Sequence, residues 1–439
     1  MKRLYKYIVI ALVVGGLLSG GMYAISYKTT ESNTQSVQQE MPGSTETSTA
    51  SGATTVDGEE MTLSESYTSS TSDESPILVT NGGTATISGA TLTKTGDSTS
   101  TESSEFSGVN AGILVQEGST ATITGATIST DAKGANAVFS TGENAKIYIK
   151  DTTINTTGES SARGLDATYG GYIEADNVTI TTQGGSCATL ATDRGEGTVK
   201  VSNSTLETNG SGSPVIYSTG DISIESTKGT ANGAQMVVIE GKNSATLKNS
   251  TLLCSAKGNR GDVDVAGIMI YQSMSGDAGE GTGTFTAENS TLEIDSKSDY
   301  YKTAPMFFIT NTDAVINLKN TKLLYGSGVL VSAMGTGEWG NSGSNGGNLT
   351  LNAESQTLKG NIEADSISSV AINLTSSTLE GAINADNTAK EVSLKLDKSS
   401  KIKLTADSYV TSLEDADTSY SNIDFNGFTL YVNGEAVKG

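Results

Sequence analysis

A phrase of nine residues that returns along the chain is the feature that most constrains its fold. Residues 84–92 have the sequence TATISGATL, and residues 120–128 have TATITGATI. Shorter copies follow at intervals of 21 to 40 residues, with β-branched alternation and no helical periodicity. Such repetition predicts a β-solenoid. The apolar residues that fill the fourth position of each copy are Ile87, Ile123, Ile149, Ala175, Val201, Ile224, Leu247, Ala287, Leu318, Ala353, Leu374 and Leu396.

Each repeat contains three short strand patterns. The first alternates polar and apolar residues, the second is a variant of S-T-L, and the third is an apolar triplet, as at 113–115, 237–239 and 268–270. Gly, Asn, Asp and Ser separate the patterns, where corners need positive φ or side-chain turn bonds. We therefore predict an all-β fold, a right-handed parallel β-helix of about twelve three-strand coils, with apolar residues inward and Thr or Ser outward.

The register of the coils makes two specific predictions. The first is that one buried column forms from Ile87, Ile123, Ile149, Val201, Leu247, Leu318 and Leu374. The second concerns Cys187 and Cys254, which fall three coils apart. At about 4.8 Å per coil they are too far apart for a disulfide, which needs Cα atoms within about 7 Å. Both cysteines are expected to be unbonded apolar filler.

The ends of the chain differ in composition from the repeats. Residues 1–27 show the basic, apolar and small-residue order of a signal peptide, or of a signal anchor if it is retained. Residues 28–74 are rich in Ser and Thr and are expected to be a disordered linker. The β-helix is assigned to 75–404 and a C-terminal cap to 405–439. The predicted localisation is extracellular or at the cell surface, with membrane attachment through the N-terminal segment as an alternative.

Charge and composition exclude several classes of function. The chain has no His, so imidazole acid–base chemistry and Ser-His-Asp hydrolases are excluded. A formal net charge of −22 opposes binding to nucleic acid phosphates.

The order of strands and corners in the repeats resembles that of the pectin-lyase-like β-helix superfamily. This superfamily includes polysaccharide lyases, polygalacturonases and many bacterial surface proteins. The S-T-L phrase is most similar to the adhesin-like and carbohydrate-binding members. Polygalacturonase motifs are poorly matched: residues 311–313 are Asn-Thr-Asp, residues 401–403 are Lys-Ile-Lys, and an Asp-Asp pair and a G-H-G are absent from the sequence. The resemblance thus implies a fold rather than an activity.

The longest intervals indicate where a ligand could bind. Spacings of 40, 31 and 35 residues follow one another across 247–353, and extra residues in a solenoid form loops at its edges. An earlier insertion at 95–110 is Ser/Thr-rich and looks featureless. The candidate ligand-binding residues in these loops are Trp339, Glu338, Tyr271, Asp277, Glu280, Tyr300, Tyr301 and Arg260.

Two alternatives remain open for most of these residues. Trp339 could be an exposed platform for a sugar ring, or it could fold back onto the coil. The same two alternatives, an exposed platform or a side chain packed against the coil, apply to Tyr300 and Tyr301. Asp262 and Asp264 could hold Ca²⁺ or act as acid and base, but in so acidic a chain the favoured interpretation is that they are solvated turn residues.

The sequence therefore favours a non-catalytic secreted or surface-attached protein that binds extended polar ligands, with a polysaccharide or a cell-surface glycan as partner. Ca²⁺ is the one cofactor considered. The first alternative is a polysaccharide lyase or glycoside hydrolase that uses carboxylates of the long coils. The second is a structural spacer at the cell surface.

Overall fold

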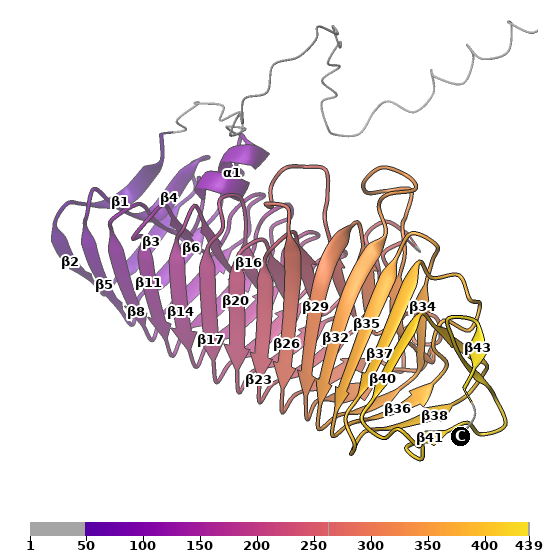
Figure 1. Ribbon diagram of the computed structural model, residues 1–439. Coiled ribbons are helices and arrows are strands. Elements are labelled where there is room, and N and C mark those ends of the chain that lie inside the picture. The colour runs from indigo at the N-terminus through magenta and orange to yellow at the C-terminus, as the bar shows by residue number, and fades with distance from the viewer. Residues whose placement is uncertain (1–48, 262, 438–439) are drawn as a thin grey trace, which may run out of the picture. The chain divides into compact units, whose positions relative to one another are not determined.

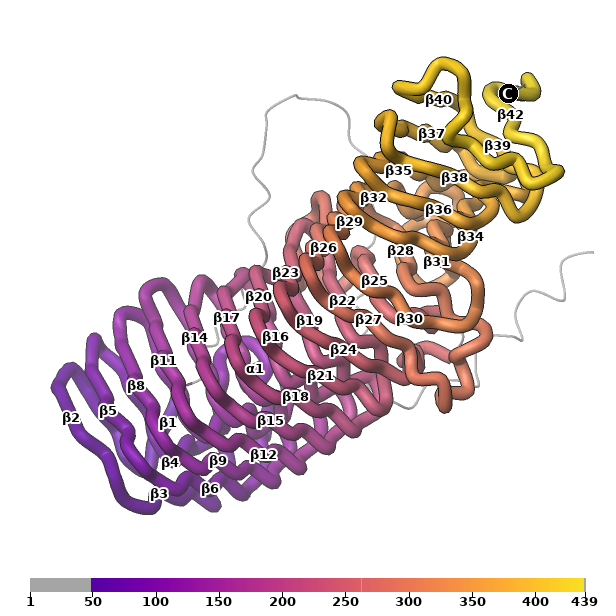
Figure 2. Tube along the Cα trace, turned by 90° about the horizontal axis from the view of Figure 1, so that it is seen from below, coloured from indigo at the N-terminus to yellow at the C-terminus, as the bar shows by residue number. Residues whose placement is uncertain are grey.

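The computed structural model describes residues 49–261 and 263–437, and this part of the chain is a parallel β-helix (Figure 1). All of the described residues belong to one compact unit of the chain. Successive strands pass through three faces of each coil, and each strand pairs with its equivalents in the neighbouring coils. Figure 2 shows the coils stacked one after another from the indigo to the yellow end.

Sheet B contains the first strand pattern of each repeat and has 14 parallel strands. These are β2 (Glu60–Leu63), β5 (Thr84–Ser88), β8 (Thr120–Thr124), β11 (Lys146–Lys150), β14 (Tyr172–Asp176), β17 (Thr198–Ser202), β20 (Asp221–Glu225), β23 (Ser244–Lys248), β26 (Thr282–Glu288), β29 (Thr312–Lys319), β32 (Gly347–Glu354), β35 (Ser369–Thr375), β37 (Glu391–Leu396) and β40 (Ser412–Asp415).

The S-T-L pattern forms two sheets rather than one. Sheet C has ten strands: β3 (Ser66–Ser69), β6 (Thr91–Lys94), β9 (Thr127–Thr130), β12 (Thr153–Thr156), β15 (Thr179–Thr182), β18 (Thr205–Thr208), β21 (Lys228–Ala231), β24 (Thr251–Cys254), β27 (Thr291–Ile294) and β30 (Lys322–Leu324). Sheet D has four: β33 (Thr357–Lys359), β36 (Thr378–Gly381), β38 (Lys401–Leu404) and β41 (Ile423–Asp424).

The apolar triplets form sheet A, which has 12 strands. These are β1 (Ser51–Asp57), β4 (Glu74–Thr80), β7 (Ile113–Val115), β10 (Val138–Thr141), β13 (Leu165–Thr168), β16 (Leu190–Thr192), β19 (Ile216–Ser218), β22 (Val237–Glu240), β25 (Ile268–Tyr271), β28 (Phe307–Thr310), β31 (Val329–Ala333) and β34 (Asn361–Ala364).

The predicted inner column is confirmed. The twelve fourth-position residues pair in one unbroken ladder of sheet B from Ile87 to Leu396. Each is at most 3% exposed. Because alternate residues of a strand point to opposite faces, the same register directs the intervening polar residues outward.

The corner between sheets B and C explains why Gly, Asn, Asp and Ser recur there. In eleven coils one residue between sheet B and sheet C or D has a φ of 46° to 65°, a left-handed conformation that favours Gly and Asn. The residues at this corner are Gly89, Gly125, Asp151, Asn177, Asn203, Ser226, Asn249, Asn289, Asn320, Ser355 and Ser376. Asn311, of the Asn-Thr-Asp sequence, is likewise a corner residue with positive φ between β28 and β29.

The solenoid extends beyond the predicted boundaries at both ends. Its first coil begins at Ser51, so the boundary at residue 75 is wrong: 51–74 forms strands, and Leu63 pairs with Ile87. Beyond residue 404, β40 and β41 add a last coil to sheets B and D, so only part of the predicted cap closes the stack. On the remaining face β39 (Ser408–Val410) pairs in parallel with β42 (Leu430–Val432) to form sheet E, and β43 (Glu435–Ala436) departs from this stacking by pairing antiparallel with β42. The signal segment 1–27 and linker residues 28–48 lie outside the described residues.

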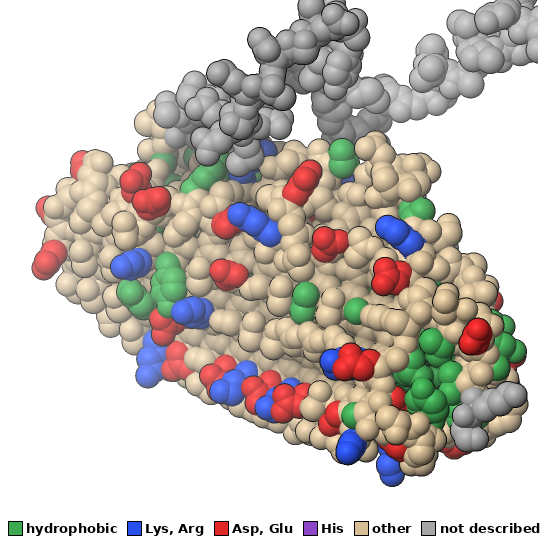
Figure 3. Space-filling model, viewed as in Figure 1, with side chains coloured by type: hydrophobic (Ala, Val, Ile, Leu, Met, Phe, Trp, Pro, Cys, Tyr) green, Lys and Arg blue, Asp and Glu red, His purple; other side chains and the backbone are tan. Residues whose placement is uncertain are grey.

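The outward face of sheet B is polar and regular. Figure 3 shows basic and acidic side chains alternating in a row along the lower edge of this face. Ion pairs join neighbouring coils, with N–O distances of 3.9 Å for Lys150–Asp176, 3.8 Å for Lys248–Glu225 and 2.9 Å for Lys319–Glu354. Exposed pairs of this kind contribute little to stability, because water and salt screen them.

Both cysteines are free and buried, which confirms that they are unbonded. Among the described residues, none of the helices has the length and apolar character needed to cross a membrane.

Candidate functional site on the outer face of sheet A

From β7 to β28, sheet A is largely buried on both faces, unlike sheet B. Its inward residues join the main core, while the central residues of the triplets point outward and are nevertheless buried. This outward row includes Leu114, Phe139, Asp166, Ala191, Val238, Met269 and Phe308. Double burial explains why the triplets are continuous apolar runs rather than alternating ones.

The cover of this face, which we call the roof, consists of the helix α1 (Thr101–Ser107) and the described residues of three loops, at 255–261 with 263–267, at 272–281 and at 334–346. The helix α1 arises from the insertion at 95–110 that looks featureless in sequence. Ser100 caps its first turn, accepting a hydrogen bond from the backbone N–H of Ser103, and Gly108 ends it with a φ of 66°. A side chain at Gly108 would collide with the ring of Phe139, so only Gly lets the helix end this close to the sheet.

A buried ionic cluster lies beneath the roof. Nη1 of Arg163 lies 2.7 Å from Oδ2 of Asp166, on β13, and 2.7 Å from Oδ2 of Asp193, just after β16. The other carboxylate oxygen of Asp166 is buried with no hydrogen-bond partner. Burial raises the pKa of Asp166, and it raises that of Asp193 to about 7 despite the opposing charge of Arg163.

A second arginine fastens two parts of the roof together. Nη2 of Arg194 lies 2.8 Å from Oδ1 of Asp277 in the loop 272–281, and its Nη1 lies 3.4 Å from Oε1 of Glu102 on α1. The guanidinium carbon lies 3.8 Å from the centre of the Phe106 ring. Planar arginine can stack and form ion pairs at once, so Arg194 holds the helix and the loop over the same coil.

Glu240, at the end of β22, organises the next part of the face. Its Oε2 accepts hydrogen bonds from the hydroxyls of Tyr217 and Tyr271, each at 2.9 Å. Its Oε1 accepts from the hydroxyl and backbone N–H of Ser273. Burial raises the pKa of the Tyr217 and Tyr271 hydroxyls well above the ordinary tyrosine value, and the charge of Glu240 raises it further.

A pocket of about 280 Å³ opens between these groups. Its lining comes from α1, from four coils of the solenoid and from two roof loops, and includes Glu105, Phe106, Arg163, Asp193, Tyr217, Asn259, Tyr271 and Asp277. The volume is near the lower end of small-molecule sites, about 300–1,000 Å³. Aromatic rings, paired charges and an amide thus meet around one concave space.

Three of the predicted ligand-binding residues meet at the far end of the roof. Arg260 forms an ion pair with Glu338 at 3.2 Å, and its guanidinium carbon lies 5.6 Å from the centre of the Trp339 ring. Trp339 itself is only 5% exposed and packs with Val238, Met269 and Phe308. The exposed-platform alternative for Trp339 is therefore wrong, because the Gly-rich loop folds the indole onto the outer face of sheet A.

The predicted carboxylates have separate roles. Asp264 is buried, and its two oxygens accept hydrogen bonds from the backbone N–H groups of Asn259 and Arg260, so it holds the loop together. Its predicted metal partner Asp262 lies outside the described residues. Asp277 is paired with Arg194, whereas Glu280 is exposed at the end of the loop. Within the residues the structure describes, no group of three or more acidic or Cys side chains is placed to hold a metal ion.

The predicted ligand-binding residues Tyr300 and Tyr301 lie away from the 280 Å³ pocket. Tyr300 is half-buried and lines a separate pocket with Val263, Phe308 and Met334. Tyr301 packs against the backbone of Gly326. Neither residue approaches the ionic cluster.

Sequence reasoning missed Arg163, Asp166, Asp193, Arg194 and Glu240, because they lie in coils of regular spacing. The sequence nevertheless contains one pattern that could have indicated the arginines. The chain has four arginines, and the three beyond Arg3 are each followed by Gly. All three lie at the outer face of sheet A.

No protein-family model, curated protein or solved structure matches this chain.

Proposed function

We propose that the protein is a non-catalytic, exported β-helix protein that binds a polysaccharide along the roofed outer face of sheet A. The observation that carries this proposal is the 280 Å³ pocket, where Arg163, Asp193, Asn259 and two tyrosines converge from separate coils. Sugar rings present an apolar face and a rim of hydroxyls. Aromatic rings match the first, and paired donors and acceptors match the second.

The charge pattern of the face supports a polar, extended ligand. Each of the three arginines is paired with at least one carboxylate, so the face offers both donors and acceptors, with carboxylates outnumbering arginines. The resemblance to adhesin-like, carbohydrate-binding β-helices points the same way. Export through the segment 1–27 would place the site where extracellular glycans occur.

A glycoside hydrolase or polysaccharide lyase is the second candidate. It is favoured by the pKa of Asp193, near 7, since a carboxyl group that stays protonated near neutral pH can act as a general acid. The position of Arg163 weighs against it. A glycosidase needs the scissile bond between its two carboxyl groups, but here Nη1 of Arg163 bridges Asp166 and Asp193.

Binding of the full chain to an array of neutral and acidic polysaccharides tests the proposal. Asn259→Ala removes an exposed amide at the pocket and should weaken binding about three- to tenfold, the scale of one lost hydrogen bond. The matched control is Asn155→Ala, an exposed Asn on the outer face of sheet C, which should leave binding unchanged. Equal binding by both variants would contradict the site, and binding to no glycan on the array would favour the structural spacer.

A turnover assay separates the binder from the enzyme. Release of reducing or unsaturated ends from the bound polysaccharide should not occur with the wild-type chain. Turnover that disappears in Asp193→Asn, while glycan binding remains, would make the protein an enzyme.

A further inference from the structure

The stack has a break in its hydrogen-bonded faces between sheets C and D. Sheet C ends at β30 and sheet D begins at β33, one coil later, and these two strands do not pair. In the same coils sheet B continues without interruption from β29 to β32, and sheet A continues from β31 to β34 with a register shift at Val329 and Val331. The coil therefore opens on one face only.

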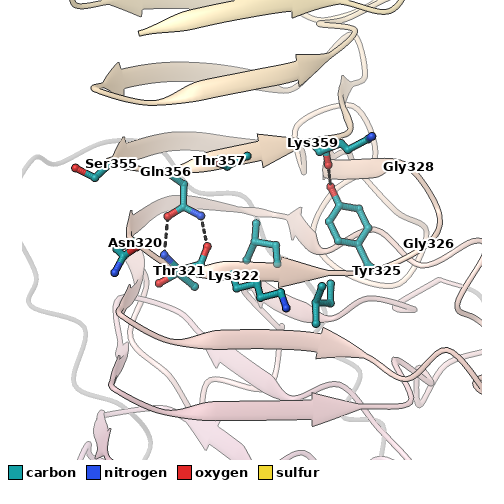
Figure 4. Close-up of a pocket in the computed structure, with 12 residues that line it drawn as sticks. Asn320, Thr321, Lys322, Tyr325, Gly326, Gly328, Ser355, Gln356, Thr357 and Lys359 are labelled. Atoms are coloured by element: carbon teal, nitrogen blue, oxygen red, sulfur yellow. Dashed lines mark hydrogen bonds between the residues drawn. The ribbon is translucent and has the colours of Figure 1, made fainter. Parts of the chain in front are cut away.

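An open groove of about 590 Å³ occupies this break, lined by residues of both strands. Figure 4 shows β33 farther from β30 than β30 lies from its other neighbour, with the groove between them. Leu323 and Leu324 lie on one wall, and Thr357 and Lys359 lie on the other. We call this space the β30–β33 slot.

Side chains replace the missing strand pairing at the two ends of the slot (Figure 4). The amide of Gln356 accepts from the backbone N–H of Thr321 at 2.8 Å and donates to its carbonyl oxygen. At the other end the hydroxyl of Tyr325 donates to the carbonyl oxygen of Lys359. Both contacts satisfy backbone groups that a neighbouring strand would otherwise satisfy.

The middle of the slot has no such replacement. In a parallel ladder, successive residues direct their backbone groups to opposite neighbours. The N–H of Lys322 bonds to Ser290, on the sheet C side, so the backbone groups of Leu323 face the slot. The N–H of Thr378 bonds to the carbonyl of Gln356, on the sheet D side, so the backbone groups of Thr357 face the slot from above.

The core is open at the same place. Strands of sheet C direct their second residue inward, and from β6 to β27 the apolar residues at this position are at most 1% exposed. Leu323 in β30 is only half-buried, whereas Leu358 on the far side of the slot is buried again. The inward residues Leu323 and Leu358 of these two consecutive coils are therefore separated by the slot.

We propose that the β30–β33 slot binds an extended peptide strand of a partner protein, which pairs in parallel with both strands and places one apolar side chain between Leu323 and Leu358. Strand addition of this kind uses backbone hydrogen bonds for affinity and alternate side chains for specificity. Lys322 and Lys359 line the slot, so an acidic residue beside the apolar one complements its charge. The peptide that fits is thus a Thr-Leu-Glu type of strand.

The sequence of β27 supplies a suitable probe, because its strand already fits the register of sheet C. An acetylated and amidated peptide with the sequence of residues 289–295, NSTLEID, should bind the full chain and slow amide exchange at 320–326 and 355–361 at least tenfold. The same peptide N-methylated at its Thr and Leu loses one donor toward each neighbour and should bind at least tenfold more weakly.

Two lysines give a matched test on the protein side. Lys359 and Lys403 both form ion pairs with Glu380, but only Lys359 lines the slot. Lys359→Ala should weaken peptide binding about two- to fivefold, the scale of an exposed ion pair, and Lys403→Ala should not.

Three results would overturn the proposal. The first is no binding of the NSTLEID peptide, and the second is equal binding of its N-methylated form. The third is protection of 320–326 and 355–361 in the full chain that rises with protein concentration and excludes the peptide, since a second copy would then fill the slot.

Discussion

The indole of Trp339 meets the phenol ring of Tyr271 edge to face, with ring centroids 5.1 Å apart and planes at 65°. The contact joins the loop 334–346 to β25, across 68 residues of sequence. Because the hydroxyl of Tyr271 also donates to Glu240, the pair connects the apolar end of the roof to the polar network at the pocket. Trp339 therefore supports the site from one side instead of offering its ring to a ligand.

Fluorescence of Trp339 tests this arrangement without mutagenesis, because the chain has one Trp. A ring that is 5% exposed should emit at shorter wavelength than Trp in water and resist quenching by acrylamide. Trp339→Ala should lower the free energy of unfolding of the roof by about 3–5 kcal/mol, the cost of a cavity left by a large ring. Emission typical of a solvent-exposed indole would contradict the packing.

Leu247→Asp tests the inner column. Leu247 is fully buried between Ile224 and Ala287, so a carboxylate there would be desolvated with no partner. We expect a loss of several kcal/mol in the free energy of unfolding, measured by urea titration. The matched control is Thr246→Asp, one residue earlier on the outward face, which should change stability by about 0.5 kcal/mol or less. Similar effects of the two substitutions would show the register to be wrong.

The corner between sheets C and A depends on stacked glycines. A Cβ at Gly210 would clash with the carbonyl oxygen of Gly184 in the preceding coil, whereas a Cβ at Gly337 in the roof would meet nothing within 4 Å. Gly210→Ala should therefore cost about 1–3 kcal/mol of unfolding free energy, as expected for overpacking. Gly337→Ala should be neutral or slightly stabilising. Thermal unfolding of the two variants, read against the wild type, checks the difference.

The buried carboxylate of Asp193 should make stability depend on pH. Its pKa is about 7 in the folded state against 3.8 for the ordinary group, so the folded protein binds the proton more tightly than the unfolded chain. The stability that this proton provides is fully present below about pH 4 and is lost as pH rises through about 7. The free energy of unfolding should thus fall between these limits.

Asp193→Asn, which mimics the protonated form beside Arg163, should flatten this dependence, as followed by urea unfolding at pH 5 and pH 7. Asp131→Asn, at an exposed position, should leave it intact. An identical slope in Asp193→Asn and wild type would show that Asp193 does not titrate in this range.

The sequence by itself determined the coils. Every coil of a parallel β-helix has the same local requirements: an inward apolar residue, an outward polar one and a corner that tolerates positive φ. These demands fall on neighbouring residues, so they are visible as the phrase at 84–92 and its copies. The first and last coils were not predicted, because at 51–69 and 408–424 the sequence matches the repeat too weakly to be distinguished from a linker or a cap.

Only the tertiary structure decided what covers sheet A and where the stack opens. Arg194 meets Asp277 across 83 residues, and Arg260 meets Glu338 across 78. An insertion of the same composition could extend into solvent or fold back. The choice depends on the apolar surface that it finds, here Phe139 for α1 and Phe308 for Trp339. The β30–β33 slot is equally invisible in sequence, because β30 and β33 both carry an ordinary strand pattern and the break arises from how the two coils stack.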